Sequence, residues 1–147
     1  MTREDYRQLS DLHVQHGKAL LEGGFYSGAW YISGYAVECG IKACIAKLFR
    51  LTADDDFPEP MSGNPGGGTI NLRSHNFKFL VQAAGLKLVW DREMNGSRRF
   101  RDNWDIVNRW SPEGRYATDR VQSEVVEFYS AIVDPNHGAM ECIKRHW

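Results

Sequence analysis

Two charged side chains stand four residues apart in the most apolar stretch of the chain. Glu38 and Lys42 lie within residues 25–46, where most other side chains are small, aliphatic or aromatic. Positions i and i+4 share one face of a helix, so the carboxylate and the ammonium group can pair there. Ion pairs inside helical bundles are more often structural than chemical. We therefore predict a buried polar tie, which His75, at the start of a later helix, can cap or reach.

Basic side chains are concentrated in the second half of the chain, beside aromatic residues. Trp104, Trp110 and Tyr116 can stack on bases, and arginine can bind phosphate. Aspartate and glutamate side chains are interleaved with the arginines, so a salt-bridged helix surface is at least as good an interpretation. The candidate RNA- or nucleotide-binding residues are Arg98, Arg99, Arg101, Arg109 and Arg115.

The remaining chemical patterns favour neither a metal nor a cofactor. His13 and His16 have a spacing that metal sites use, but no third ligand accompanies them. Residues 54–56 are three aspartates without the spacing of a calcium loop. Residues 63–69 are glycine-rich but lack the Lys-Ser/Thr ending of a phosphate loop. We expect no metal and no cofactor.

Composition predicts one folded domain over residues 1–147. The 18 basic and 19 acidic side chains give a net charge of −1, which excludes a globally basic protein that coats nucleic acid. Cys39, Cys44 and Cys142 lack metal-ligand spacing, and no secretory signal is visible at the start of the chain. We therefore expect a cytoplasmic protein with reduced thiols. The charged pair in residues 25–46 argues against a membrane span.

Apolar periodicity predicts helices almost throughout and a sheet that is absent or marginal. The fold class is all-α, an antiparallel up-and-down bundle of four to five main helices. Residues 51–73 are rich in proline, glycine and acidic residues and predict one long exposed loop. The expected helix boundaries are Gly23–Gly24 after the first helix, Ser74 before the third, a short helix over 86–94, Trp110 at the end of the next, Thr118 before the one after it, and Asp134–Pro135 before the last.

The order of these motifs resembles the HEPN family of small prokaryotic helical domains over nearly the whole chain outside 51–73. The second helix has the form small-x-x-Tyr-Ala-x-Glu-x-x-x-Lys-Ala, the third opens with a histidine and reaches a leucine, and an Arg-Tyr follows a helix that ends in tryptophan. The matching positions are Tyr35, Ala36, Glu38, Lys42, Ala43, His75, Leu80, Arg115 and Tyr116.

The resemblance implies a helical domain that pairs into homodimers. Members of the family include RNA-cleaving toxins and antiphage or RNA-processing proteins, and many are encoded beside a minimal nucleotidyltransferase. Its ribonucleases carry an arginine followed four to six residues later by a histidine. Here the only such string runs from Arg7 to His13 in the first helix, and no histidine lies in the segment that contains Arg109 and Arg115.

Three functions remain open. The first is a non-catalytic HEPN-like domain that binds RNA or a nucleotide, as a component of a toxin–antitoxin or defence-type pair. The second is an atypical metal-independent ribonuclease built on Arg109, Arg115, Tyr116 and His137. The third is a dimeric adaptor without a nucleic-acid role. The high aromatic content, five tryptophans, six tyrosines and seven phenylalanines, supports a homodimer through an exposed aromatic face.

Overall fold

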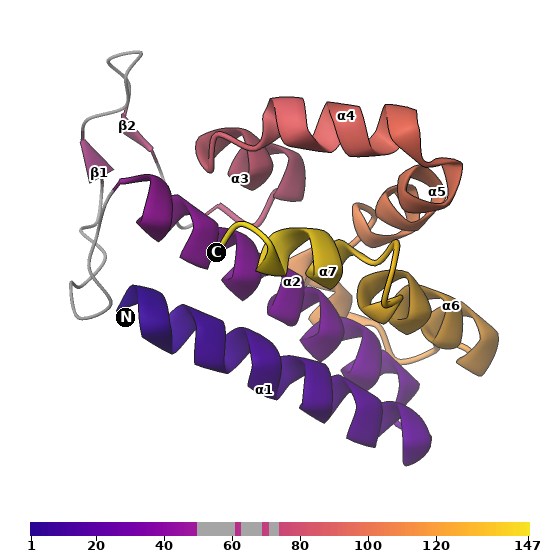
Figure 1. The fold of residues 1–147 in the computed structure, drawn as a ribbon. Coiled ribbons are helices and arrows are strands. Elements are labelled where there is room, and N and C mark those ends of the chain that lie inside the picture. Colours follow the sequence, from indigo (N-terminus) through magenta and orange to yellow (C-terminus); the bar gives the residue numbers. More distant parts are fainter. Residues whose placement is uncertain (50–60, 63–68, 71–73) are drawn as a thin grey trace.

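The computed structural model describes residues 1–49, 61–62, 69–70 and 74–147, which contain seven α-helices, one 3-10 helix and one pair of two-residue strands (Figure 1). The all-α class is confirmed. The predicted loop over 51–73 lies outside the described residues except for the antiparallel strand pair, in which Met61 is opposite Ile70. The elements are α1 (Arg3–Glu22), α2 (Tyr26–Leu48), β1 (Met61–Ser62), β2 (Thr69–Ile70), α3 (Phe77–Ala83), α4 (Lys87–Gly96), α5 (Arg98–Val107), η1 (Pro112–Tyr116), α6 (Gln122–Val133) and α7 (Ala139–Lys144).

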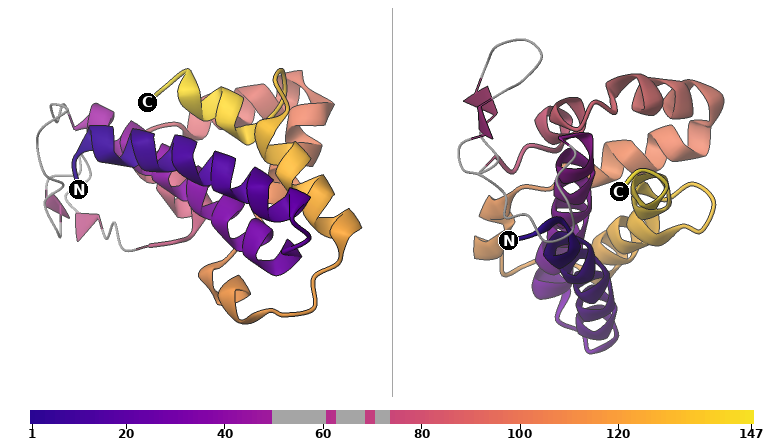
Figure 2. Two further views of the ribbon diagram at one scale, coloured as in Figure 1. Left: turned by 90° about the horizontal axis from the view of Figure 1, so that it is seen from below. Right: turned by 60° about the vertical axis from the view of Figure 1, so that its left-hand side comes forward.

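The two longest helices form a hairpin. α1 begins with a capping box, in which the Thr2 hydroxyl accepts the backbone N–H of Asp5 and the Asp5 carboxylate accepts that of Thr2. The helix ends where predicted, because Gly24 has a φ of +80° that glycine adopts without strain. α2 then returns alongside α1, and the two lie together in both views of Figure 2.

α2 lies at the centre of the fold, as its lack of a polar face predicts. It packs against α1, α3, α6, α7 and η1. Close approach depends on its glycines: a Cβ atom at Gly34 would lie 2.1 Å from Trp110 Cδ1, and one at Gly40 would lie 2.8 Å from Ile143 Cγ2. Small residues on this helix therefore let its neighbours pack directly against its backbone.

The described residues contain each helix that the sequence predicts, including the short one over 86–94, which corresponds to α4. Only α1 and α2 exceed 12 residues, and the other five helices have between 6 and 12. An up-and-down arrangement is therefore not confirmed. Among the described residues, no helix combines the length and hydropathy needed to cross a bilayer.

The predicted boundaries of two middle helices were wrong by a few residues. Asn76, rather than Ser74, caps α3, because its side-chain oxygen accepts the backbone N–H of Phe79 at 3.0 Å. α5 ends at Val107 instead of Trp110. The chain leaves the helix there, and the Trp110 indole N–H donates to the backbone oxygen of Tyr31 on α2, 3.2 Å away.

The starts of the last two helices also differ from the prediction. Thr118 does not cap α6, because residues up to Val121 stay extended while the Arg120 guanidinium lies 3.5 Å from the centroid of the Trp30 ring. Asp134 does not begin α7. Its carboxylate accepts the backbone N–H groups of Asn136 and His137, and the resulting turn delays the helix until Ala139.

Most described aromatic side chains are buried in the core or pack against it. Trp110 stacks on Phe77 with ring centroids 5.1 Å apart, and Trp90 meets Trp104 edge to face at 5.2 Å. Among the described aromatic residues, only three have large exposed fractions, namely Phe25, Phe79 and Tyr116. The aromatic content therefore stabilises the monomer and does not form the exposed face on which the homodimer expectation depends.

Candidate functional site

Glu38 and Lys42 form the buried ion pair that the sequence predicts. Lys42 Nζ lies 2.7 Å from Glu38 Oε1, and the two side chains are 9% and 2% exposed respectively. Both lie on α2 and are buried, so an unpaired charge at either position would be costly. The second carboxylate oxygen, Oε2, remains available to another partner.

That partner is His75, which was predicted from the sequence to be able to reach the polar tie. Its Nδ1 lies 2.8 Å from Glu38 Oε2, and its side chain is 38% exposed. Because a carboxylate only accepts hydrogen bonds, Nδ1 carries the hydrogen and donates it. In the neutral ring Nε2 is then an acceptor, and it has no hydrogen-bond partner among residues 1–49 and 74–147.

The exposed side of His75 belongs to a surface that we call the η1 corner, made of Tyr31, His75, Glu113, Arg115 and Tyr116. η1 lies directly on α2, since a Cβ atom at Gly114 would fall 2.0 Å from the Trp30 ring. Backbone and Ser111 hydroxyl hydrogen bonds hold the pKa of Glu113 below its usual value, and Arg115 and His75 lower it further. The fold thus brings a histidine to the segment of Arg115, where the sequence shows none.

Arg115 and Tyr116 form the exposed edge of this corner. Arg115 Nη2 donates to the Tyr116 hydroxyl at 2.9 Å, and its guanidinium carbon lies 4.8 Å from the centroid of that ring. Hydrogen bonding to Tyr116 and Tyr31 raises the pKa of Arg115, so its charge is permanent. Tyr35 lies next to the corner on α2, with its ring 5.3 Å from that of Tyr31. Burial and the Glu38 carboxylate raise the pKa of Tyr35 to about 12.

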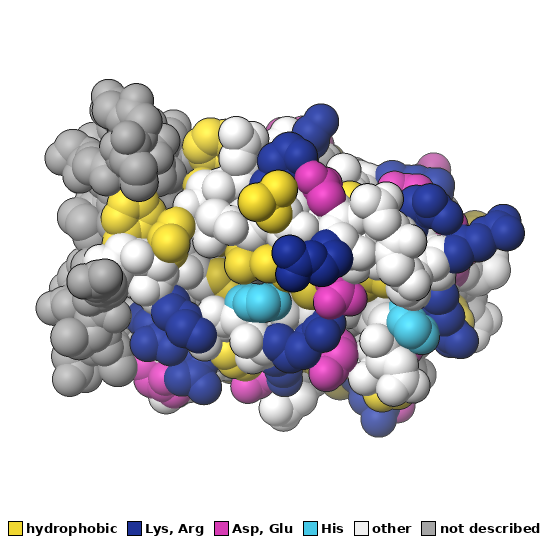
Figure 3. Space-filling view, turned by 45° about the horizontal axis from the view of Figure 1, so that its top comes forward, with side chains coloured by type: hydrophobic (Ala, Val, Ile, Leu, Met, Phe, Trp, Pro, Cys, Tyr) yellow, Lys and Arg dark blue, Asp and Glu magenta, His cyan; other side chains and the backbone are white. Residues whose placement is uncertain are grey.

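The other candidate arginines lie on or just after α5. Arg98 is 86% exposed and 3.8 Å from Asp102, while Arg99 pairs with Asp134 at 2.8 Å. Arg101 and Arg109 are also exposed. The rise of 1.5 Å per residue makes α5 about 14 Å long from Arg98 to Val107, and Arg109 lies beyond its end. The arginines therefore do not converge on one site. Acidic and basic side chains lie next to one another on the face that Figure 3 draws.

His137 lies with the first turn of α5 and not with Arg115. Its Nδ1 is 3.1 Å from Ser97 Oγ, its backbone oxygen accepts the Asn103 side-chain N–H at 2.9 Å, and its backbone N–H donates to Asp134. The ribonuclease constellation predicted from Arg109, Arg115, Tyr116 and His137 is therefore not assembled around His137. The separation arises because the turn at Asp134 directs the chain toward the start of α5.

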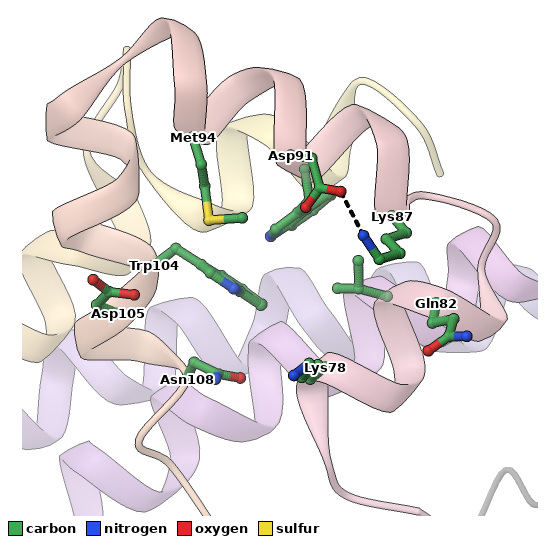
Figure 4. Close-up of a pocket in the computed structure, with 10 residues that line it drawn as sticks. Lys78, Gln82, Lys87, Asp91, Met94, Trp104, Asp105 and Asn108 are labelled. Atoms are coloured by element: carbon green, nitrogen blue, oxygen red, sulfur yellow. Dashed lines mark hydrogen bonds and ion pairs between the residues drawn. The ribbon is translucent and has the colours of Figure 1, made fainter.

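A cavity of about 420 Å³ lies between α3, α4 and α5 (Figure 4). Figure 4 shows Met94 and Trp104 directed toward it from different helices, with Lys78 and Asn108 at its edge. Apart from Trp104, sequence reasoning missed these residues. Each helix contributes only two to four of them, and only the tertiary packing brings the three sets together.

No three histidine, cysteine, aspartate or glutamate side chains gather as a metal site in the part of the chain that the structure describes. His13 and His16 lie side by side on α1 with ring centroids 6.0 Å apart. Burial and the charge of His16 lower the pKa of His13, which also meets the Tyr35 ring edge to face. His13 thus contacts α2, whereas His16 is exposed.

Comparisons with known proteins found no counterpart. No protein-family model matches the chain, and neither a curated protein nor a solved structure does. The arguments for function therefore depend on this chain's own residues.

Proposed function

We propose that the protein binds RNA or a nucleotide through the η1 corner and does not cleave RNA efficiently. The observation that supports this most directly is the adjacent, exposed placement of Arg115 and Tyr116. A guanidinium group binds phosphate, and an exposed aromatic ring stacks on an unpaired base. Tyr31 and His75 extend the same surface with further planar groups. Arg98, Arg99, Arg101 and Arg109 would add phosphate contacts along α5 without taking part in this centre.

The setting that we propose is a HEPN-like domain in a prokaryotic toxin–antitoxin or defence-type pair. The motif residues Glu38, Lys42 and His75 support it, since they form the buried polar tie between the central helix and the start of α3. We also propose a homodimer, a minimal nucleotidyltransferase as a partner and a cytoplasmic location. Three free, buried cysteines are compatible with a reducing compartment.

A second candidate function, metal-independent ribonuclease activity, is favoured by the position of His75. Nδ1 is held by Glu38, so Nε2 can take the proton of a ribose 2′-hydroxyl group bound beside Arg115. The 2′-oxygen then forms a bond to phosphorus while the bond from phosphorus to the 5′-oxygen breaks. The 5′-oxygen takes a proton from water, and a 2′,3′-cyclic phosphate remains. Here His75 replaces His137 as the base.

Fluorescence anisotropy with a labelled single-stranded RNA tests the binding proposal. The test compares Arg115→Glu with Arg98→Glu, which makes the same change of charge at a site that is 86% exposed on α5. We expect Arg115→Glu to weaken binding at least tenfold and Arg98→Glu to weaken it only about twofold, with a shallower salt dependence in both. An equal loss of affinity in the two variants would show that the η1 corner is not the main binding site and that the arginines of α5 contribute as much. If the unaltered protein shows no salt-dependent binding of RNA, the result would favour a dimeric adaptor without a nucleic-acid role.

Cleavage is tested separately on the same RNA in the presence of a metal chelator. The proposal expects no rapid cleavage and no difference between the unaltered protein and His75→Gln. The ribonuclease alternative expects a 2′,3′-cyclic phosphate product that disappears in His75→Gln but not in His137→Gln. Loss in His137→Gln alone would instead support the constellation predicted from the sequence.

A further inference from the structure

The cavity between α3, α4 and α5 is separate from the η1 corner and has the size of a small-molecule site. Its volume of about 420 Å³ falls within the range of about 300–1,000 Å³ typical of ligand pockets. Val81, Met94 and the indole rings of Trp90 and Trp104 provide its apolar surface. The two rings are edge to face, 5.2 Å apart at an angle of 73°.

Trp90 has a hydrogen-bond donor without a partner. Its side chain lines the cavity and is 2% exposed, and its Nε1 is buried with no acceptor within the described part of the chain. Trp110 is similarly buried, but its indole N–H donates a hydrogen bond to the backbone oxygen of Tyr31. Buried polar groups are nearly always hydrogen-bonded in native proteins. An acceptor bound in the cavity would satisfy the Trp90 donor.

The rim of the cavity is polar and balanced in charge. Lys87 pairs with Asp91 at 2.6 Å, and Asp105 adds a second carboxylate. Lys78 has no ion pair among residues 1–49 and 74–147, so its ammonium group is available. The amides of Gln82 and Asn108 can both donate and accept hydrogen bonds.

We infer that this cavity binds the base of a purine or pyrimidine nucleoside or nucleotide. A base is planar, so it can enter between the helices and contact the accessible edge of the Trp104 indole ring, whose side chain is 6% exposed. Its ring nitrogens and carbonyl oxygens are acceptors for the Trp90 N–H, and its exocyclic groups suit the amide of Asn108. A 5′-phosphate would reach Lys78. The inference does not depend on RNA binding at the η1 corner.

Nuclear magnetic resonance of the tryptophan indole N–H groups provides the direct test. The protein, labelled with nitrogen-15, is titrated with the four ribonucleosides and then with their 5′-monophosphates, each at millimolar concentration. Trp90→Phe identifies the Trp90 signal by its loss and keeps an aromatic ring in place. We expect a saturable downfield shift of this signal with at least one nucleoside, and tighter binding of the corresponding monophosphate.

Substitutions of cavity residues test whether nucleoside binding depends on those side chains. Trp90→Phe should weaken binding about tenfold, as the loss of one buried hydrogen bond does. Asn108→Ala, a change on the exposed rim that leaves the core intact, should weaken it several-fold. Lys78→Ala should reduce only the advantage of the monophosphate. Trp147→Phe lies outside the cavity and should leave the affinity unchanged.

Two results would overturn the inference. One is the absence of any saturable shift with nucleosides and nucleotides, and the other is unchanged affinity in both Trp90→Phe and Asn108→Ala. A shift of the Trp90 signal with RNA but not with free nucleotides would also overturn it, because the cavity would then not bind a nucleoside or nucleotide by itself. Arg115→Glu distinguishes the two surfaces, because it should weaken RNA binding at the η1 corner at least tenfold and leave nucleoside binding unchanged.

Discussion

Substituting one partner of the buried ion pair should destabilise the fold strongly. Lys42 Nζ and Glu38 Oε1 are 2.7 Å apart, with side chains 9% and 2% exposed. Glu38→Gln leaves the Lys42 ammonium group in the core without its counter-charge, although the new amide can still accept from His75. Breaking such a pair from one side costs about 3–5 kcal/mol. A loss of about 3 kcal/mol lowers the melting temperature by roughly 10 °C for a chain of this length.

Urea unfolding at neutral pH, followed by tryptophan fluorescence and by circular dichroism, measures this loss. The matched control is Asp91→Asn, because Lys87 and Asp91 have the same i, i+4 spacing and lie 2.6 Å apart, but with side chains 63% and 42% exposed. We expect the control to cost less than about 0.5 kcal/mol. The spacing along the helix is thus the same while burial changes, although the order of the two charges is reversed.

A double-mutant cycle completes the test. Glu38→Gln combined with Lys42→Met removes both charges, so it should cost less than the sum of the single changes by about 2 kcal/mol or more. Single changes that each cost below about 1 kcal/mol and add without coupling would refute the reasoning. They would show that Lys42 reaches water when it loses its partner.

Two further predictions concern packing and thiol chemistry. Gly34→Ala should lower the unfolding free energy by about 3 kcal/mol, because its Cβ atom would lie 2.1 Å from Trp110. Gly28→Ala on the same helix meets only Leu20 at 3.6 Å and should raise the unfolding free energy by about 0.5 kcal/mol in the same urea assay. Burial raises the pKa of Cys39 and Cys44 to about 12 and that of Cys142 to about 11. In the native protein no thiol should therefore react quickly with an aromatic disulfide reagent at pH 8, and all three should react in denaturant.

The burial of Glu38 and Lys42 could be predicted because it depends on one helix alone. A segment with no polar face must lie in the core, and two opposite charges at i and i+4 on it must then pair. The end of α1 at Gly23–Gly24 was likewise encoded locally. The starts of α6 and α7 were not, since Arg120 stacking on Trp30 and the Asp134 turn are contacts that displace an otherwise reasonable N-cap.

The η1 corner and the cavity could not be predicted, because each is assembled from distant segments. His75 and Glu38 are 37 residues apart, and the loop predicted between them gives no indication of their contact. Sequence reasoning therefore looked for a histidine within a few residues of Arg115 and found none. The donor of Trp90 lacks a partner only because of where α3 and α5 lie, which no spacing within α4 reveals.

The Glu38 carboxylate links stability to the proposed function, since one oxygen holds Lys42 in the core and the other orients His75 at the surface. A substitution at Glu38 therefore disturbs both and cannot by itself identify a functional role. His75→Gln is more informative, because its side chain is partly exposed and its removal leaves the buried pair intact. A variant with near-normal stability and altered RNA binding or cleavage would assign the η1 corner to function. Unchanged behaviour toward RNA would leave His75 as the solvent-facing end of a structural tie.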